Sequence, residues 1–244
     1  LWDFEDIGDW WTRADPAGIA PIVAVPTTAG TGSEVGRAGV ITDSQAHVKK
    51  VIFHPKMLPA VVICDPELSV GMPPFITAGT GLDALSHCLE AYCAPGYHPM
   101  AEGIAVEGIR LVKEWLPVAY AQPDNLEARG HMLSAAAMGA TAFQKGLGGM
   151  HALAHPIGAL YDTHHGMTNA VVMPYVLAAN REAIAPRIER LAARHADKLK
   201  VTAADGTSTV VAIVDSTKIK SSSGLFGGNA KLGADALLNG LPVT

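Results

Sequence analysis

One carboxylate and one imidazole lie four residues apart in a segment with a helical apolar pattern. Asp83 and His87 fall within residues 80–92, where apolar residues recur at spacings of three and four. Residues four apart on a helix share one face, one turn apart, so the two side chains can reach a common ligand. The alternative is an Asp–His contact on the protein surface, which contributes little to stability.

A second group of histidines lies further along the chain. His151 and His155 are again four residues apart, and the pair His164 and His165 follows. Neutral imidazole is the commonest metal ligand at physiological pH. Imidazoles with a carboxylate suit Fe(II), Zn(II) or another first-row divalent ion, and a site without cysteine more often serves catalysis than structure. Histidines of the core or of an interface, satisfied by hydrogen bonds, are the alternative.

A loop of small and hydroxylated residues follows the first apolar run. It spans residues 26–34 and carries Thr27, Thr28 and Thr31. The loop matches neither a Walker motif nor the dinucleotide glycine pattern. Open α/β sheets bind ligands at the ends of their strands, so contact with a ligand and a plain threonine-capped turn both remain open.

The elements that must position these residues change in kind near residue 72. Before it, short apolar runs rich in β-branched residues are typical of strands buried on both faces, as in an α/β sheet. After it, the apolar spacing is helical. We expect strands within 19–25, 40–42, 51–53 and 60–64, and helices over 80–92, 101–116 with an end at Pro117, 126–143, 167–180 and 182–199.

Three segments follow from this change. We predict an α/β segment over residues 1–72 and an all-helical domain over residues 73–199. Residues 200–244 contain more Gly and Ser around one β-like run, 210–214, and we expect an atypical tail.

Composition excludes several classes of protein. The 244 residues are 49% hydrophobic and 17% charged, which is typical of a globular chain. The net charge of -5 offers no electrostatic reason to bind nucleic acid. The longest near-apolar stretch, residues 133–143, is too short to span a membrane. Three cysteines do not form a disulfide framework, so we expect a reducing cytoplasm.

Four motifs together resemble the iron-containing (group III) alcohol dehydrogenases. They are Pro26-Thr-Thr-Ala-Gly-Thr-Gly-Ser-Glu-Val35, Thr80-Gly-Leu-Asp-Ala-Leu-Ser-His87, His151-Ala-Leu-Ala-His-Pro-Ile-Gly158 and His164-His-Gly-Met-Thr-Asn-Ala170, in the family's order. The resemblance covers about residues 1–190. It implies the dehydroquinate synthase-like two-domain fold, in which an α/β nucleotide-binding domain precedes an all-α metal domain.

The resemblance also implies roles for individual residues. Carried over by position, the metal ligands are Asp83, His87, His151 and His165, and an additional histidine suspected in proton transfer is His155. The loop that touches the nicotinamide cofactor carries Thr27, Thr28 and Thr31, and the lysine that approaches it is Lys49. His164 is then a neighbour of the metal site and no ligand.

The family's glycine-rich phosphate-binding turn, which precedes the threonine-rich loop, has no counterpart in the sequence. We therefore expect an incomplete nucleotide-binding domain and a chain that is part of a longer polypeptide, since it begins at Leu1 in the middle of the pattern.

The resemblance implies an NAD- or NADP-dependent oxidoreductase that interconverts a small alcohol and its aldehyde or ketone, with Fe(II) or Zn(II) polarising the substrate oxygen. For the full-length protein we expect a cytoplasmic homo-oligomer. The alternatives are an enzyme like glycerol dehydrogenase or dehydroquinate synthase, and a non-catalytic metal-binding fragment of a dehydrogenase. His165 and the threonine-rich loop argue against the first of these.

Overall fold

The computed structural model describes residues 14–43, 45 and 48–194, and four later strands at 199–202, 208–212, 218–221 and 231–232. The chain divides into two compact units, residues 1–170 and 171–244. The boundary between these units, at residue 170, does not test the boundaries that the sequence predicts near residues 72 and 199, and those stay predictions.

Four short strands form two separate pairs in the first unit. β1 (Val23–Ala24) pairs in parallel with β4 (Val61–Val62), and β2 (Ala38–Asp43) is antiparallel to β3 (Val48–Phe53). Each overlaps a run that the sequence predicts as a strand. The expectation that these strands are buried on both faces is wrong, because Val23 and Val61 are 59% and 49% exposed. Among the described residues each of these strands has one partner, and a two-stranded pair leaves much of its apolar surface open.

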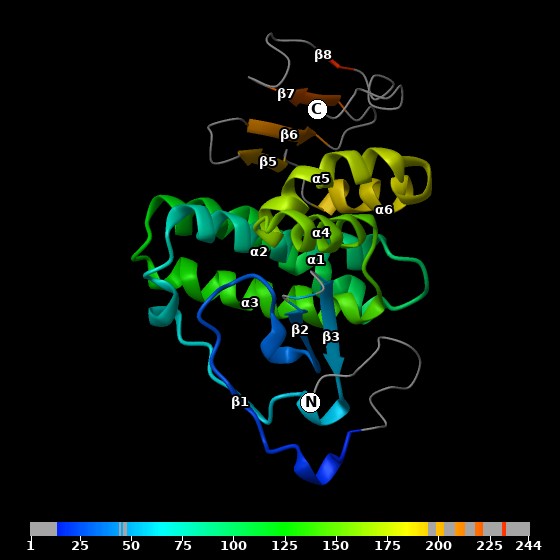
Figure 1. Cartoon of the computed structure of the whole chain (residues 1–244). Helices are drawn as coiled ribbons and strands as arrows, with labels where there is room; N and C mark the ends of the chain where they lie inside the picture. Colours follow the sequence, from blue (N-terminus) through cyan, green and yellow to red (C-terminus); the bar gives the residue numbers. More distant parts are fainter. Residues whose placement is uncertain are drawn as a thin grey trace. The chain divides into compact units, whose positions relative to one another are not determined.

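Three long helices form the centre of the first unit and lie side by side (Figure 1). They are α1 (Pro74–Cys93), α2 (Pro99–Ala121) and α3 (Leu126–Ala142). α1 is buried almost all round, and its leucines at 82, 85 and 89 are at most 5% exposed. A helix that is covered on every side belongs to the core, which excludes the surface alternative for Asp83 and His87.

Two shorter helices complete the part of the unit that bears the histidines. α4 (Gly149–Tyr161) continues through Pro156, and α5 (His165–Ala179) begins directly at the second histidine of the pair. The predicted helix end at Pro117 is wrong, since α2 runs on to Ala121. A proline removes one backbone donor, and here the helix continues for one more turn beyond it.

The second unit contains the rest of α5, α6 (Arg181–Arg194) and a sheet with the strand order β5-β6-β7-β8. These strands are Leu199–Thr202, Ser208–Ala212, Lys218–Ser221 and Lys231–Leu232. The expected β-like run overlaps β6, whereas the helix expected over residues 182–199 ends earlier, because Leu199 belongs to β5. No helix in the described part of the chain is long and apolar enough to cross a membrane.

Two glycines let the beginning of α5 approach α1 closely. A Cβ on Gly166 would lie 2.0 Å from the carbonyl oxygen of Gly79, and a Cβ on Gly79 would meet the ring of His164 at 2.6 Å. Only residues without side chains fit such a backbone-to-backbone approach. This contact places His165 next to the face of α1 that carries Asp83.

Candidate metal centre

Three side chains from three helices of the first unit converge, two of them buried and one partly exposed. Asp83 of α1, His151 of α4 and His165 of α5 each offer one ligand atom, and these atoms all lie within 4.8 Å of one another. Asp83 Oδ1 is 3.7 Å from His151 Nε2 and 3.6 Å from His165 Nε2. Asp83 and His151 are each 3% exposed. We call these three residues the ligand cluster.

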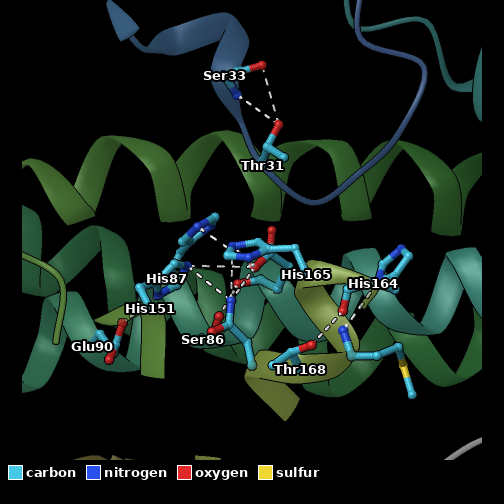
Figure 2. Close-up of polar contacts among 12 residues, drawn as sticks. Thr31, Ser33, Ser86, His87, Glu90, His151, His164, His165 and Thr168 are labelled. Carbon is cyan, nitrogen blue, oxygen red and sulfur yellow. Dashed lines mark hydrogen bonds and ion pairs between the residues drawn. The ribbon is translucent and has the colours of Figure 1, made fainter. Parts of the chain in front are cut away.

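His87 lies beside the ligand cluster but outside it. Its Nε2 is 4.0 Å from Asp83 Oδ1, and its ring stacks on that of His151 with 4.6 Å between centroids. Figure 2 shows the two rings beside His165. Burial lowers the pKa of His87 to about 3, and the nearby charge of His151 acts in the same direction. The imidazole is therefore neutral at physiological pH, which is the form that binds metals.

Asn169 lies within the group and was not predicted. Its amide donates to Asp83 Oδ1 at 2.9 Å and faces the Nε2 atoms of His151 and His165 at 3.2 Å each. The side chain is completely buried. Asn169 follows His165 by four residues on α5, so helical spacing from a predicted ligand is the signal that could have identified it.

Glu90 is a second residue of the site that the sequence motifs do not single out. Its Oε2 lies 2.5 Å from Nδ1 of His151, and its Oε1 accepts a hydrogen bond from the Met150 N–H at 2.7 Å. Burial alone would raise the pKa of Glu90, but the hydrogen bond from His151, that residue's charge and backbone N–H groups outweigh it and lower the pKa. Glu90 is therefore ionised. It lies seven residues after Asp83, on the same face of α1.

His155 lies one turn beyond His151 on α4. Its ring centroid is 4.9 Å from that of His165 and 6.1 Å from that of His151. The side chain is half-buried, whereas His151 is buried. His155 is thus more exposed than His151, and a group that passes protons to solvent needs such exposure.

His164 is a structural residue. Its Nδ1 accepts a hydrogen bond from the Met167 N–H at 3.3 Å at the beginning of α5, and its ring packs edge-on against Phe75 with 5.5 Å between centroids. It is not a member of the ligand cluster.

The threonine-rich loop packs against the helices while its hydroxyl groups remain exposed. Thr27, Thr28 and Thr31 are all exposed. Gly32 has a positive φ of 59°, and a Cβ there would lie 2.3 Å from the carbonyl oxygen of Ala136 on α3. Thr31 Oγ1 accepts the Ser33 N–H at 3.3 Å (Figure 2). The backbone of Lys49 belongs to β3, but its side chain lies outside the described part of the structure.

The donor set fits a first-row divalent cation. One carboxylate and two imidazoles, with a third imidazole adjacent, form the mixed nitrogen and oxygen set that Fe(II) and Zn(II) accept. The described cysteines, Cys64, Cys88 and Cys93, are free thiols and none is part of the ligand cluster. The fold and the cluster thus define a class: an α/β segment followed by a helical domain with a candidate metal centre.

Comparison with known proteins shows the family. Residues 1–66 match the model of the iron-containing alcohol dehydrogenases, and residues 77–225 match the C-terminal model of the Fe-containing alcohol dehydrogenase family. The chain belongs to the iron-containing alcohol dehydrogenase family. The second match extends into the segment that we expect to be atypical.

Individual relatives agree with this family. The chain is 46% identical over 172 residues to a 4-hydroxybutyrate dehydrogenase of Cupriavidus necator, covering 67% of this chain and 44% of the relative. It is 40% identical over 220 residues to an NAD-dependent methanol dehydrogenase of Bacillus methanolicus, covering 88% and 56%. A crystal structure of 1,3-propanediol oxidoreductase superposes with a TM-score of 0.69 at 43% identity, covering 72% of this chain and 47% of that one. The chain spans about half the length of the curated relatives it matches.

Proposed function

We propose that the protein containing this chain is a metal- and NAD(P)-dependent oxidoreductase that interconverts a small alcohol and its aldehyde or ketone. The observation that carries the proposal is the ligand cluster of Asp83, His151 and His165, the first two of them buried, in a member of this family. The relatives include methanol and 1,3-propanediol dehydrogenases, which supports this function over one like that of glycerol dehydrogenase.

The ligand cluster would hold the metal, with His87 as the fourth ligand. A bound Fe(II), or Zn(II) in its place, supplies Lewis acidity toward an alcohol or carbonyl oxygen. Burial of Asp83 and His151 excludes water from their side of the site, which strengthens their electrostatic effect on a charged ligand. The close contact between Gly79 and Gly166 orients His165 toward them.

The remaining predicted residues act on the proton and on the cofactor. His155, half-buried and one turn from His151, would accept the proton of the alcohol and pass it toward solvent. NAD or NADP supplies hydride transfer when bound. Thr27, Thr28 and Thr31 present exposed hydroxyl groups to such a cofactor. Lys49 stays a candidate by its position in the family's pattern.

We also propose a cytoplasmic location and a homo-oligomeric full-length protein. The free state of the described cysteines is what a reducing compartment maintains. Relatives of this kind act on small molecules, and a small alcohol or aldehyde is the substrate class proposed for the present protein.

The test is turnover by the metal-loaded full-length protein that contains this chain. Purified protein with Fe(II) or Zn(II), NADH and a short aldehyde should consume NADH, and His165→Ala should abolish this. His131→Ala is the matched control, since His131 stacks on Trp115 and is not a member of the ligand cluster. Metal binding without turnover would favour the second candidate, a non-catalytic metal-binding unit, and absence of metal binding would overturn both.

A further inference from the structure

Glu90 connects two elements of the candidate metal centre. It lies on α1, and its carboxylate meets the beginning of α4, where Gly148 precedes the helix and has no side chain to cap it. A Cβ at position 148 would lie 3.0 Å from Glu90 Oε1, so the glycine leaves room for the carboxylate. The carboxylate of Glu90 takes the place of the missing cap by accepting the Met150 N–H.

We propose that Glu90 is a positioning residue that fixes His151 as the tautomer with a proton on Nδ1, so that Nε2 is left to bind the metal. Oε1 accepts the N–H of Met150, and Oε2 lies 2.5 Å from Nδ1 of His151. A carboxylate oxygen at this distance from a ring nitrogen is typically the acceptor of that nitrogen's N–H, so Nδ1 carries the proton. The inference rests on the metal site of the proposed function.

The environment of the other ring nitrogen agrees independently. Asn169 Nδ2 lies 3.2 Å from Nε2 of His151 and 2.9 Å from Asp83 Oδ1. The carboxylate of Asp83 requires the amide nitrogen of Asn169 at this position, because a carboxamide oxygen there would face another acceptor. A donor therefore faces Nε2 while an acceptor faces Nδ1, and both neighbours select the same tautomer.

The pairing of two donors with one side chain explains why position 90 requires a carboxylate. The Met150 N–H and the His151 Nδ1–H point at two different oxygens of Glu90. A glutamine at this position has one acceptor and one donor group, so it can satisfy only one of these two N–H groups. Either the first turn of α4 loses its cap, or the proton of His151 moves to Nε2 and blocks the metal-binding atom.

The first measurement is the metal affinity of Glu90→Gln, with Zn(II) titrated in competition with a chromophoric chelator. We expect the dissociation constant to rise by about 10- to 100-fold, as is typical when the hydrogen-bond partner of a metal-binding histidine is removed. The matched control is Glu102→Gln, which removes a carboxylate that is also largely buried but pairs with Lys145. It should lower the thermal midpoint without changing the dissociation constant. Equal zinc affinity of Glu90→Gln and the unmodified chain would overturn the inference.

The second measurement does not depend on metal or on the stability of a variant. Long-range nitrogen–proton NMR spectra of the metal-free chain report which ring nitrogen of His151 is protonated. We expect Nδ1–H in the unmodified chain and a loss of this preference in Glu90→Gln. A proton on Nε2 in the unmodified chain would overturn the inference, whereas failure of that chain to bind zinc would instead overturn the proposed function.

Discussion

Substitution of Gly166 by alanine tests whether the contact between α5 and α1 positions a metal ligand. The added Cβ would lie 2.0 Å from the oxygen and 2.8 Å from the carbon of the Gly79 carbonyl, and 3.0 Å from Cβ of Asp83. Two of these three atoms belong to the backbone, so no side-chain rotation relieves the overlap. The beginning of α5 would have to move away by about 1 Å or more to regain ordinary packing distances.

The substitution should lower both the stability of the fold and its affinity for zinc. Overpacking of a close contact destabilises a protein by about 1–3 kcal/mol, occasionally more. Because His165 is the neighbouring residue, the same displacement separates its Nε2 from Asp83 Oδ1, which is 3.6 Å away in the structure. We therefore expect Gly166→Ala to reduce both the unfolding free energy and the zinc affinity.

Gly103 on α2 provides the matched control. A Cβ there meets no atom within 4 Å. Gly103→Ala should stabilise the chain by about 0.5–1 kcal/mol, since glycine disfavours the helix interior. Urea unfolding gives the free energies, and chelator competition gives the affinities. A Gly166→Ala variant as stable as the unmodified chain, with unchanged zinc affinity, would show that this contact does not position His165.

Three further predictions concern buried polar groups. Asn169→Asp places a second carboxylate where the amide lies 2.9 Å from Asp83 Oδ1, so zinc should raise the thermal midpoint more in this variant than in the unmodified chain. Burial lowers the pKa of His87 to about 3, whereas the pKa of an unfolded histidine is about 6.5. Between these two pH values the unfolded state binds a proton that the folded state does not. The unfolding free energy of the metal-free chain should therefore fall as the pH drops from about 6.5 toward about 3, by up to about 1.4 kcal/mol per pH unit. The fall should be less steep in His87→Gln. Arg129, 1% exposed, donates to the Pro123 carbonyl and to Thr77 Oγ1, so Arg129→Lys should cost about 1–3 kcal/mol in urea unfolding.

Each of these has an outcome that contradicts it. If zinc raised the thermal midpoint equally in Asn169→Asp and in the unmodified chain, the carboxylate of Asp83 and the one introduced at position 169 would not face one another. The same pH dependence of the unfolding free energy in His87→Gln and in the unmodified chain would show that His87 is not held neutral in the folded state. An unfolding free energy of Arg129→Lys within about 0.5 kcal/mol of the unmodified value would show that the guanidinium hydrogen bonds do not hold α1 and the loop before α3 together.

The sequence predicts where the site lies on the helices better than it predicts all the residues that form the site. Asp83 and His151 could be identified because carboxylates and imidazoles at a spacing of four are unusual on an apolar helix. Glu90 and Asn169 follow the same helical spacing, but a glutamate or an asparagine on a helix is most often a solvated residue. Their roles depend on contacts between helices, which spacing within one segment does not contain.

In the α/β segment, too, the sequence predicts some features and not others. The positions of β1 and β4 are predicted by their β-branched residues, whereas their exposure is not. Burial depends on how many strands and helices cover each face, which is a property of the assembled sheet. The continuation of α2 beyond Pro117 likewise depends on local hydrogen bonding, because one missing donor does not always end a helix.

Elemental analysis after dialysis against Fe(II) or Zn(II) measures whether the ligand cluster holds one divalent cation. We expect one equivalent of metal per chain, lost in Asp83→Asn and His165→Ala and retained in His131→Ala. Full metal content in the first two variants would contradict this expectation.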